Sequence, residues 1–188
     1  MTIGKWRHLD QRTVHRDRWI HLTSNRFEYE GRIIDPYYLF HYPDWVVVVA
    51  LTRERRVVLV RQYRPGCDEV TVEFPTGVID PEDADPMAAG LRELREESGF
   101  GGGEAVLVEP LTVHPSHFRN RYHVVVVEGV ERLGDQALDA TEWLEVETVE
   151  VDELERMIDR GELNIGPQIG AYLRAKLRFP GRFRTGGE

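Results

Sequence analysis

A short apolar run, Trp45–Leu51 (WVVVVAL), constrains the fold of this chain more than any other segment. A continuous run of this length that is rich in β-branched residues predicts a buried strand. The charged segment Arg53–Arg56 follows it, and Val57–Tyr63 then repeats the apolar strand pattern. Two buried strands joined by a short polar turn are expected to pair as a hairpin.

Strand patterns dominate the rest of the first half and return later. Further strands are predicted over Trp19–Tyr29, Ile33–Tyr42, Val70–Phe74, Val106–Val113, Tyr122–Glu128 and Trp143–Val149. The first two of these are separated by a turn at Glu30-Gly31-Arg32, and Pro36 indicates an edge or an irregularity in the second.

Helical patterns occur once in the middle of the chain and twice near its end. Met87–Ser98 carries apolar residues at helical spacing, and Gly99 is placed to end that helix. Asp152 with Glu155 resembles a capping box that starts a second helix, and Pro167–Leu177 is a third. This order of strands and helices predicts an α+β domain in which helices pack on a mixed sheet.

The composition excludes several classes of protein. A chain of 188 residues is expected to form one domain. Its 33 acidic and 24 basic residues give a net charge of −9, which argues against broad binding to nucleic acid. No apolar run approaches the roughly 18 residues of a membrane span. The first residues lack an apolar core, so we expect no signal peptide. Cys67 is the sole cysteine, which excludes an intrachain disulfide, and we expect a cytoplasmic protein.

Acidic residues cluster on the central helix. Glu93 and Glu97 are four residues apart and therefore share one helix face, which Glu96 flanks. Three neighbouring carboxylates repel one another unless solvent, an arginine or a cation relieves the repulsion. One interpretation is a solvated face paired with Arg92 and Arg95. The other is a site for a hard divalent cation such as Mg2+, which prefers oxygen ligands and also binds phosphates. The glycine turn and acidic loop before the helix favour the metal site.

The stretch Gly77–Phe100 resembles the Nudix box of the Nudix hydrolases. That motif has a glycine, five residues, a glutamate, seven residues, and then R-E-U-x-E-E-x-G-U, where U is a bulky apolar residue. The segment Arg92–Phe100 matches every fixed position of the second half. Gly77 lies one residue too far upstream, so the loop contains an insertion and the first glutamate falls on Asp83 or Ala84, with Glu82 adjacent.

Residues outside the box resemble the ADP-ribose pyrophosphatase branch of the superfamily. They are Arg61-Gln62-Tyr63-Arg64, Glu73-Phe74-Pro75-Thr76-Gly77, Tyr42-Pro43-Asp44-Trp45-Val46, and Pro115, fifteen residues after Phe100. The resemblance implies a Nudix fold, a mixed β-sheet sandwiched between helices (α/β/α) with an N-terminal antiparallel β extension. It also implies an N-terminal β segment over residues 1–44 that forms homodimers, a Nudix domain over 45–180, and a tail over 181–188.

The same resemblance implies the reaction. We expect Mg2+-dependent hydrolysis of the diphosphate bond of ADP-ribose or a related nucleoside diphosphate sugar, giving a nucleoside monophosphate and a sugar phosphate. Mn2+ is an alternative cation, and no nucleic acid or membrane partner is expected. The residues implied are Arg92, Glu93, Glu96 and Glu97 for catalysis; the Thr76 carbonyl with Glu93, Glu96 and Glu97 for the metal; and Arg61, Arg64, Glu73, Pro115 and His117 for substrate.

The sequence offers several candidates for the general base and for the residue that stacks on the nucleobase. In the branch that the chain resembles, a glutamate on the loop after the proline often acts as base, but the loop His114–His123 contains no acid. His114, His117 and Glu96 are the remaining candidates. Aromatic residues that could stack on a nucleobase, and that could equally be core or interface residues, are Trp19, Tyr37 and Trp45.

Two other functions compete with this one. A hydrolase specific for GDP- or UDP-sugars fits the same box, because the loop around His117 departs from the ADP-ribose pattern. A non-catalytic Nudix module that senses a nucleotide is a different class, although such modules often lose box acids and Glu93, Glu96 and Glu97 are all present here.

Overall fold

The computed structural model describes residues 3–184. The chain divides into two compact units. One contains the residues up to Asp44 together with Thr112–Arg121, and the other contains Trp45–Leu111 and the residues from Tyr122 onward. The first is called the N-terminal unit and the second the main unit.

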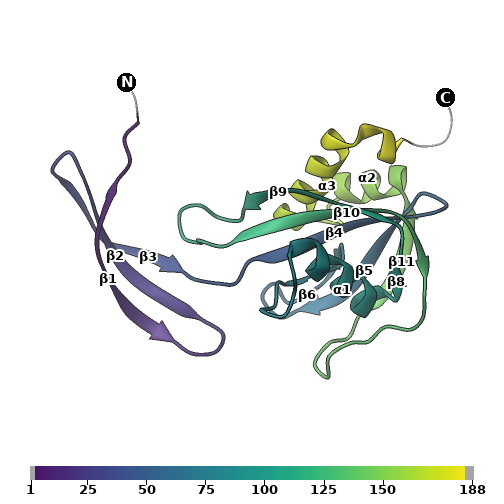
Figure 1. Cartoon of the computed structure of the whole chain (residues 1–188), viewed down its shortest axis with the longest axis horizontal. Coiled ribbons are helices and arrows are strands. Elements are labelled where there is room, and N and C mark those ends of the chain that lie inside the picture. Colours follow the sequence, from purple (N-terminus) through teal and green to yellow (C-terminus); the bar gives the residue numbers. More distant parts are fainter. Residues whose placement is uncertain (1–2, 185–188) are drawn as a thin grey trace. The chain divides into compact units, whose positions relative to one another are not determined.

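A mixed sheet forms the centre of the main unit (Figure 1). β4 (Trp45–Thr52) lies in its middle, antiparallel to β5 (Arg56–Arg64) and parallel to β10 (Arg121–Arg132). β11 (Glu145–Glu150) continues the sheet beyond β5, and β8 (Phe100–Gly101) continues it beyond β10. Shorter pairings add β6 (Glu69–Glu73) to β5, β7 (Thr76–Val78) to β4, and β9 (Glu104–Thr112) to β10.

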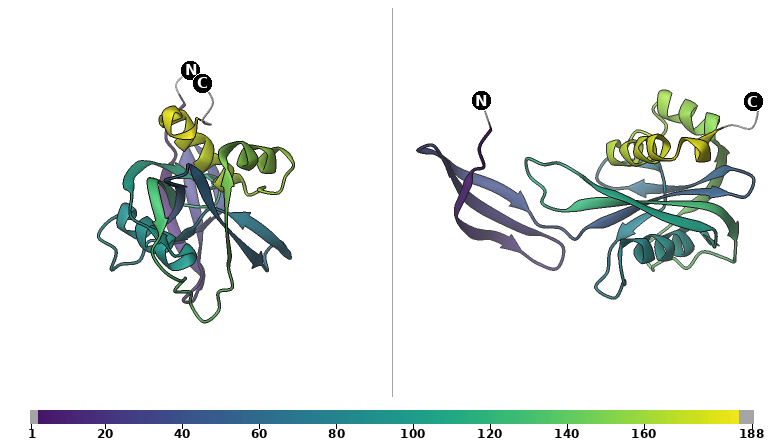
Figure 2. Two further views of the ribbon diagram at one scale, coloured as in Figure 1. Left: turned by 90° about the vertical axis from the view of Figure 1, so that its right-hand side faces the viewer. Right: turned by 45° about the horizontal axis from the view of Figure 1, so that its top comes forward.

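Helices cover both faces of this sheet, which is why its central strands are apolar throughout. α1 (Pro86–Ser98) lies on one face, and α2 (Val151–Asp159) and α3 (Gly166–Arg178) lie on the other (Figure 2). Val46–Val49 and Val57–Val60 are fully buried. The predicted buried hairpin and the α+β arrangement are therefore confirmed.

The ends of the helices follow local sequence signals in one case and not in another. α1 begins after Asp85, whose side chain accepts a hydrogen bond from the Ala88 amide, and it ends at Gly99 with φ of 74°. The predicted capping box at Asp152 is wrong. The residue that caps α2 is Glu150, whose side chain makes no capping bond, and Asp152 lies inside the first turn. The helix starts earlier because β11 runs directly into it.

The N-terminal unit is a three-stranded antiparallel sheet in the order β1 (Arg7–Arg16), β2 (His21–Tyr29) and β3 (Arg32–Phe40). This confirms the predicted β extension. Sequence patterns missed β1, because all ten of its residues are exposed and no apolar alternation marks it. Pro36 lies on β3, an edge strand, after a cis peptide bond. The loop Thr112–Arg121 joins this unit through a bridge from Phe118 to Phe40.

The end of the described chain packs on the main unit. A short 3-10 helix, Pro180–Phe183, follows α3, and its Phe183 is buried edge-on against Tyr172 with ring centroids 5.6 Å apart. Within the predicted tail, Phe183 is thus packed, and residues 185–188 lie outside the described residues. None of the helices within residues 3–184 is long and apolar enough to cross a bilayer.

Candidate active site

The segment that links β6 to β7 lies directly against the acidic face of α1. The Pro75 carbonyl accepts a hydrogen bond from the Val48 amide at 2.8 Å, which fixes the segment on the central strand. The Thr76 amide then donates to Oε2 of Glu97 at 2.9 Å. The glycine turn and the acidic helix that the sequence placed in succession are therefore joined in space.

Glu97 is a buried carboxylate, only 4% exposed. Its pKa is raised to about 8, chiefly by burial and also by the negative charges of Glu93, Glu142 and Glu73, which together outweigh the lowering by the Thr76 hydrogen bond. The solvated-face interpretation fails for this residue. A buried carboxylate beside other carboxylates is a position at which a cation is strongly favoured.

Glu93 lies one turn earlier on the same face and reaches across to Gly77. A side chain on Gly77 would place its Cβ only 1.9 Å from the Glu93 carboxylate, so the absence of one leaves the room that this carboxylate occupies. Burial raises the pKa of Glu93, and an ion pair with Arg92 opposes that rise.

Arg92 organises the acids around it. Its guanidinium donates to Glu93 at 2.8 Å, to Glu96 at 3.0 Å and to both carboxylate oxygens of Asp83 at 3.1 and 2.9 Å. The predicted hydrogen bond from Arg92 to a glutamate is therefore present, and the planar fork of the guanidinium suits several acceptors at once. These bonds lower the pKa of Asp83.

The three box glutamates are not equivalent. Glu93 and Glu97 are largely buried, whereas the Glu96 side chain is 41% exposed and is engaged by Arg92. Within residues 3–184, no group of three or more histidine, cysteine, aspartate or glutamate side chains is arranged to hold a metal ion. The oxygen donors that fit a hard divalent cation are the carboxylates of Glu93 and Glu97 with the backbone carbonyl of Thr76, whose amide already binds Glu97.

A cavity of about 540 Å³ adjoins this segment, with Arg64, Glu73, Thr76, Trp45, Cys67 and Gln168 among its lining residues. Glu73 is 2% exposed and accepts two hydrogen bonds from Arg64, at 2.7 and 2.6 Å. The structure thus brings together three of the predicted residues, Arg64, Glu73 and Thr76. Trp45 also lies here and stacks on Tyr122 with ring centroids 5.0 Å apart.

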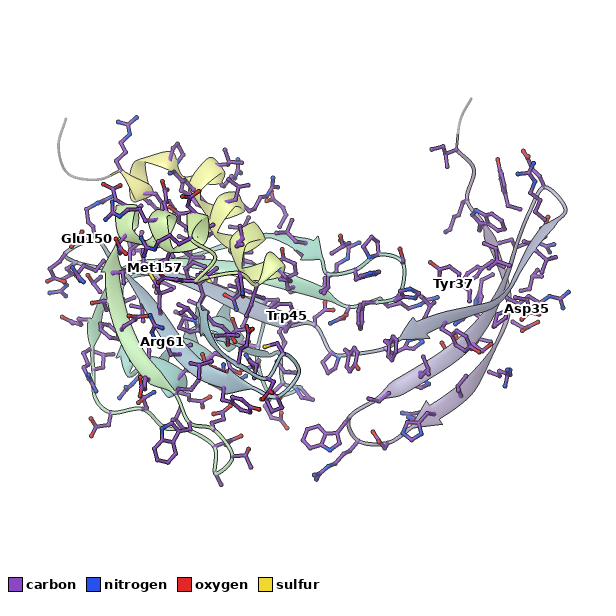
Figure 3. All side chains as sticks on the ribbon, turned by 180° about the vertical axis from the view of Figure 1, so that it is seen from behind. Asp35, Tyr37, Trp45, Arg61, Glu150 and Met157 are labelled. Carbon is purple, nitrogen blue, oxygen red and sulfur yellow. The ribbon has the colours of Figure 1, made fainter. Side chains whose placement is uncertain are left out.

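Arg61 lies apart from that cavity. It is three residues before Arg64 on β5, so their side chains leave opposite faces of the strand. Its Nε donates to Glu147 of β11 at 2.8 Å, and Figure 3 shows Arg61 beside that strand. The structure therefore does not join Arg61 with Arg64.

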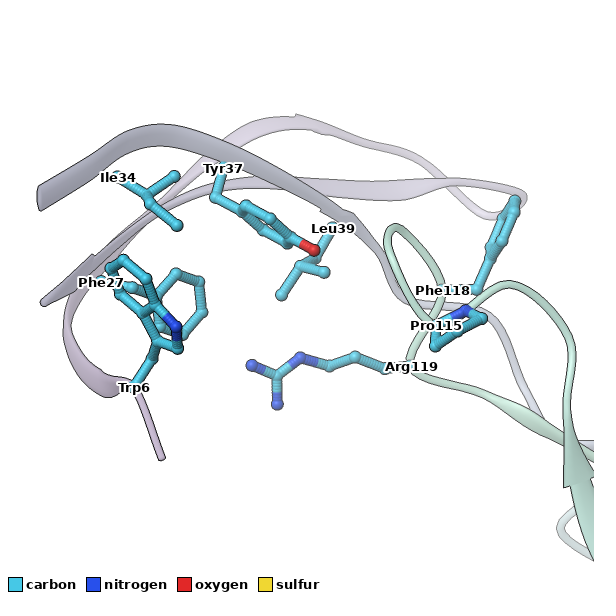
Figure 4. Close-up of a pocket in the computed structure, with 8 residues that line it drawn as sticks. All are labelled: Trp6, Phe27, Ile34, Tyr37, Leu39, Pro115, Phe118 and Arg119. Carbon is cyan, nitrogen blue, oxygen red and sulfur yellow. The ribbon is translucent and has the colours of Figure 1, made fainter. Parts of the chain in front are cut away.

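Pro115 and His117 belong to the N-terminal unit. Pro115 lines an aromatic cavity of about 430 Å³ in that unit, into which the Arg119 guanidinium points (Figure 4). His117 stacks on His114, with ring centroids 5.2 Å apart, and on Tyr37, at 6.4 Å. Trp19 is mostly exposed under the Arg18 guanidinium. Roles for these residues in substrate binding stay predictions.

Sequence reasoning missed one acid, Glu142. It lies on the exposed loop before β11, and its charge contributes to the raised pKa of both Glu93 and Glu97. Gln136, on the same loop, donates to the Glu97 carbonyl at 2.5 Å and to the Leu144 carbonyl at 3.2 Å, which fastens the loop to the end of α1. In the sequence, Glu142 is only one acid in a loop before a strand. No local pattern connects that loop to the acidic residues of α1.

Comparison with known proteins adds a family and several relatives. A family model described as the NUDIX domain matches residues 41–168. The chain is 29% identical over 116 residues to a methanol dehydrogenase activator of Bacillus methanolicus, a match that covers 61% of this chain and 62% of the activator. It is 27% identical over 123 residues to an ADP-ribose pyrophosphatase of Bacillus subtilis (strain 168), covering 65% of this chain and 66% of that enzyme.

The matched stretches thus span a little under two thirds of these curated relatives. A solved structure described as an ADP compounds hydrolase superposes with a TM-score of 0.85 over 98% of this chain and 100% of that one, at 23% sequence identity. At that identity the likeness shows a shared fold.

Proposed function

The chain belongs to the NUDIX family, and from that premise we propose that it hydrolyses the diphosphate bond of ADP-ribose or a related nucleoside diphosphate sugar with the help of Mg2+. The products would be a nucleoside monophosphate and a sugar phosphate. The neighbouring carboxylates of Glu97, which is buried, and Glu93, which is 14% exposed, carry this proposal, because two adjacent carboxylates away from water are unfavourable unless a cation compensates their charge.

Residues of α1 and of the β6–β7 link would hold the metal. They are Glu93, Glu97 and the Thr76 carbonyl, with Glu96 at the exposed rim and Mn2+ as an alternative to Mg2+. When bound, the cation neutralises phosphate oxygens and lowers the pKa of a water molecule. Arg92 would orient Glu93 and Glu96 through its hydrogen bonds to both.

Glu142 is the best candidate to accept the proton of the attacking water. Its carboxylate acts electrostatically on both inner glutamates, and its loop is fastened to α1 through Gln136. A carboxylate within hydrogen-bond reach of a water molecule can act as a general base. His114 and His117 lie on the N-terminal unit, where they contact aromatic rings and Nδ1 of His117 also lies 3.3 Å from the Tyr38 carbonyl.

A single substitution tests that role. Glu142→Gln keeps the shape of the side chain and its hydrogen bond from the Asp139 amide but removes the basic oxygen. We expect kcat to fall about 100-fold or more, the usual contribution of general base catalysis, with KM little changed. Glu145→Gln, on the adjoining strand, is the matched control. Equal activity in both variants and the wild type would exclude Glu142 as the base.

Substrate recognition would use the cavity next to the metal site. Arg64 is held by Glu73 through two charge-assisted bonds, so it presents a fixed positive charge to the diphosphate. Relatives named for ADP-ribose and ADP compounds favour an adenine nucleotide. GDP- and UDP-sugars remain the alternative substrates, and the assay below includes them.

A regulatory role is the second candidate function. One relative is named an activator of methanol dehydrogenase, which is consistent with a module that acts on another protein. The intact acids on α1 favour catalysis over this role. A protein that only senses a nucleotide would bind it without turning it over.

A panel assay separates these functions. The full-length protein would be incubated with ADP-ribose, ADP-glucose, GDP-mannose and UDP-glucose in the presence of Mg2+ and a phosphatase, and the release of phosphate would be measured. We expect turnover of at least the ADP compounds and its loss on addition of EDTA. Binding of a nucleotide without any release of phosphate would contradict the proposal and support the sensor.

A further inference from the structure

Gln168, in the first turn of α3, is only 1% exposed. A buried primary amide is unfavourable unless its oxygen and its nitrogen both find partners, at a cost of about 1–3 kcal/mol for each group left unpaired. The partners that Gln168 finds therefore define what it does for the fold. Neither of them lies on its own helix.

Both ends of the amide bind one short piece of the β6–β7 link. The Gln168 Oε1 accepts a hydrogen bond from the Phe74 amide at 2.9 Å, and its Nε2 donates to the Thr76 hydroxyl at 2.9 Å. That hydroxyl in turn donates to the Phe74 carbonyl at 2.8 Å. The Phe74 amide can only donate and the Thr76 hydroxyl proton is already used, so the orientation of the Gln168 amide is chemically determined.

The same piece of backbone carries the contacts of the metal site. The Pro75 carbonyl is held by the Val48 amide, and the Thr76 amide donates to Glu97 at 2.9 Å. The hydrogen bonds of Gln168 reach this segment from the opposite side of the sheet, since α3 and α1 cover different faces (Figure 2). The Pro75–Thr76 peptide, which leads into the Thr76 carbonyl, is thus fixed from α1 and from β4, and the Phe74 amide and Thr76 hydroxyl on either side of it are fixed from α3.

We infer that Gln168 is a positioning residue, which orients the Thr76 backbone toward Glu97 and so completes the divalent-metal site. This inference rests on the proposed function, because Thr76 and Glu97 are metal ligands only under that proposal. An outer residue that orients metal ligands changes metal affinity or activity by about 10–100-fold when it is replaced.

A matched control lies one turn along the same helix. Tyr172 is also buried, and its hydroxyl donates to Glu155 of α2 at 2.6 Å. Tyr172→Phe therefore removes a buried hydrogen bond from α3 without touching the bonds of Phe74 or Thr76. If Gln168 served stability alone, Gln168→Leu and Tyr172→Phe would have the same consequences.

The experiment measures Mn2+ binding to the folded, full-length protein by electron paramagnetic resonance, without substrate, alongside thermal unfolding. We expect Gln168→Leu to weaken Mn2+ binding at least about tenfold, and Tyr172→Phe to leave it within twofold. Thr76→Val should reproduce the Gln168→Leu effect, Thr76→Ser should retain wild-type affinity, and the double variant Gln168→Leu/Thr76→Val should be no worse than either single variant. If Gln168→Leu fails to fold, the difference in Mn2+ affinity between Thr76→Val and Thr76→Ser tests the inference instead.

Activity supplies the second measurement. With ADP-ribose, we expect Gln168→Leu to require a higher Mg2+ concentration and to lower kcat. Wild-type Mn2+ affinity in Gln168→Leu or in Thr76→Val, or an equal loss in Tyr172→Phe, would overturn the inference, as would a wild-type protein that binds no Mn2+. A wild-type protein that binds Mn2+ but hydrolyses no substrate would refute the proposed function alone, and the Mn2+ affinities would still decide the role of Gln168.

Discussion

Gly77 and Glu93 show how much the metal site depends on individual residues. Residue 77 must be glycine for the Glu93 carboxylate to approach the backbone, since this carboxylate occupies the position that a Cβ would take. The carboxylate is the far end of a flexible side chain, so a methyl group at residue 77 would displace the acid and leave the backbone in place.

Gly77→Ala should therefore uncouple activity from stability. We expect metal affinity and turnover to fall about 10–100-fold, because Glu93 is pushed from its position, while the melting temperature changes little. Gly181→Ala is the control and should match the wild type, because no atom lies within 4 Å of the position that its new methyl group would take. Calorimetry and an assay of Mg2+ dependence would measure both effects. Unchanged Mg2+ dependence in Gly77→Ala would show that Glu93 does not need its present position.

Single residues also mark the limit of what the sequence could predict about the site. Glu93 and Glu97 were predicted to share a face because their spacing of four is a local property of a helix. Glu142 and Gln168 reach the site through tertiary contacts, from a loop and a helix far along the chain. A glutamine in an amphipathic helix is expected on its polar face, and the sequence pattern does not show that Gln168 is buried.

At the scale of elements, a sequence that resembles a helix cap does not always form one in the structure. Asp85 caps α1 with a hydrogen bond to the Ala88 amide at 2.8 Å, so the helix that carries the acids has a fixed start. Asp152 was predicted to cap α2 but lies within its first turn, because β11 leads straight into the helix and buried Val151 anchors it. β1 was missed for a related reason, since its pairing with β2 depends on backbone bonds and not on an apolar face.

The two aspartates should therefore differ on replacement. Asp85→Ala is expected to lower the free energy of unfolding by about 1 kcal/mol, the usual value of an N-cap. Asp152→Ala removes only an interaction with the helix dipole, worth about 0.3–1 kcal/mol for an exposed residue. Urea denaturation of both variants compares them. A larger loss in Asp152→Ala would mean that it caps α2 in solution.

At the scale of the whole molecule, the N-terminal unit bears apolar side chains that its own sheet leaves exposed. They are Leu9, Val14, Trp19, Ile33 and Tyr38. Apolar side chains exposed in this way can take part in contacts with a partner. The resemblance to dimeric enzymes suggests a second copy of the chain as the partner, and residues 1–44 as the segment that mediates the contact.

Light scattering on the eluting peak of a size-exclusion column tests this expectation. A homodimer would have about twice the 21.8 kDa mass of the chain across a range of protein concentrations. A mass of one chain at all concentrations would contradict it. Most strands and helices of both units were predictable because their patterns are local, whereas β1 and the assembly of the chain depend on pairing and contacts that local patterns do not show.

The central claim is that the buried acids of α1 hold the cation that hydrolysis requires, and Glu97→Gln tests it most directly. This change keeps an oxygen to accept the Thr76 amide bond and removes the charge. The products formed from ADP-ribose and Mg2+ would be quantified by chromatography for the variant and the wild type. We predict AMP and ribose 5-phosphate from the wild type, and a rate at least about 100-fold lower from the folded variant, since a catalytic cation contributes several kcal/mol. Equal rates of product formation would contradict the claim.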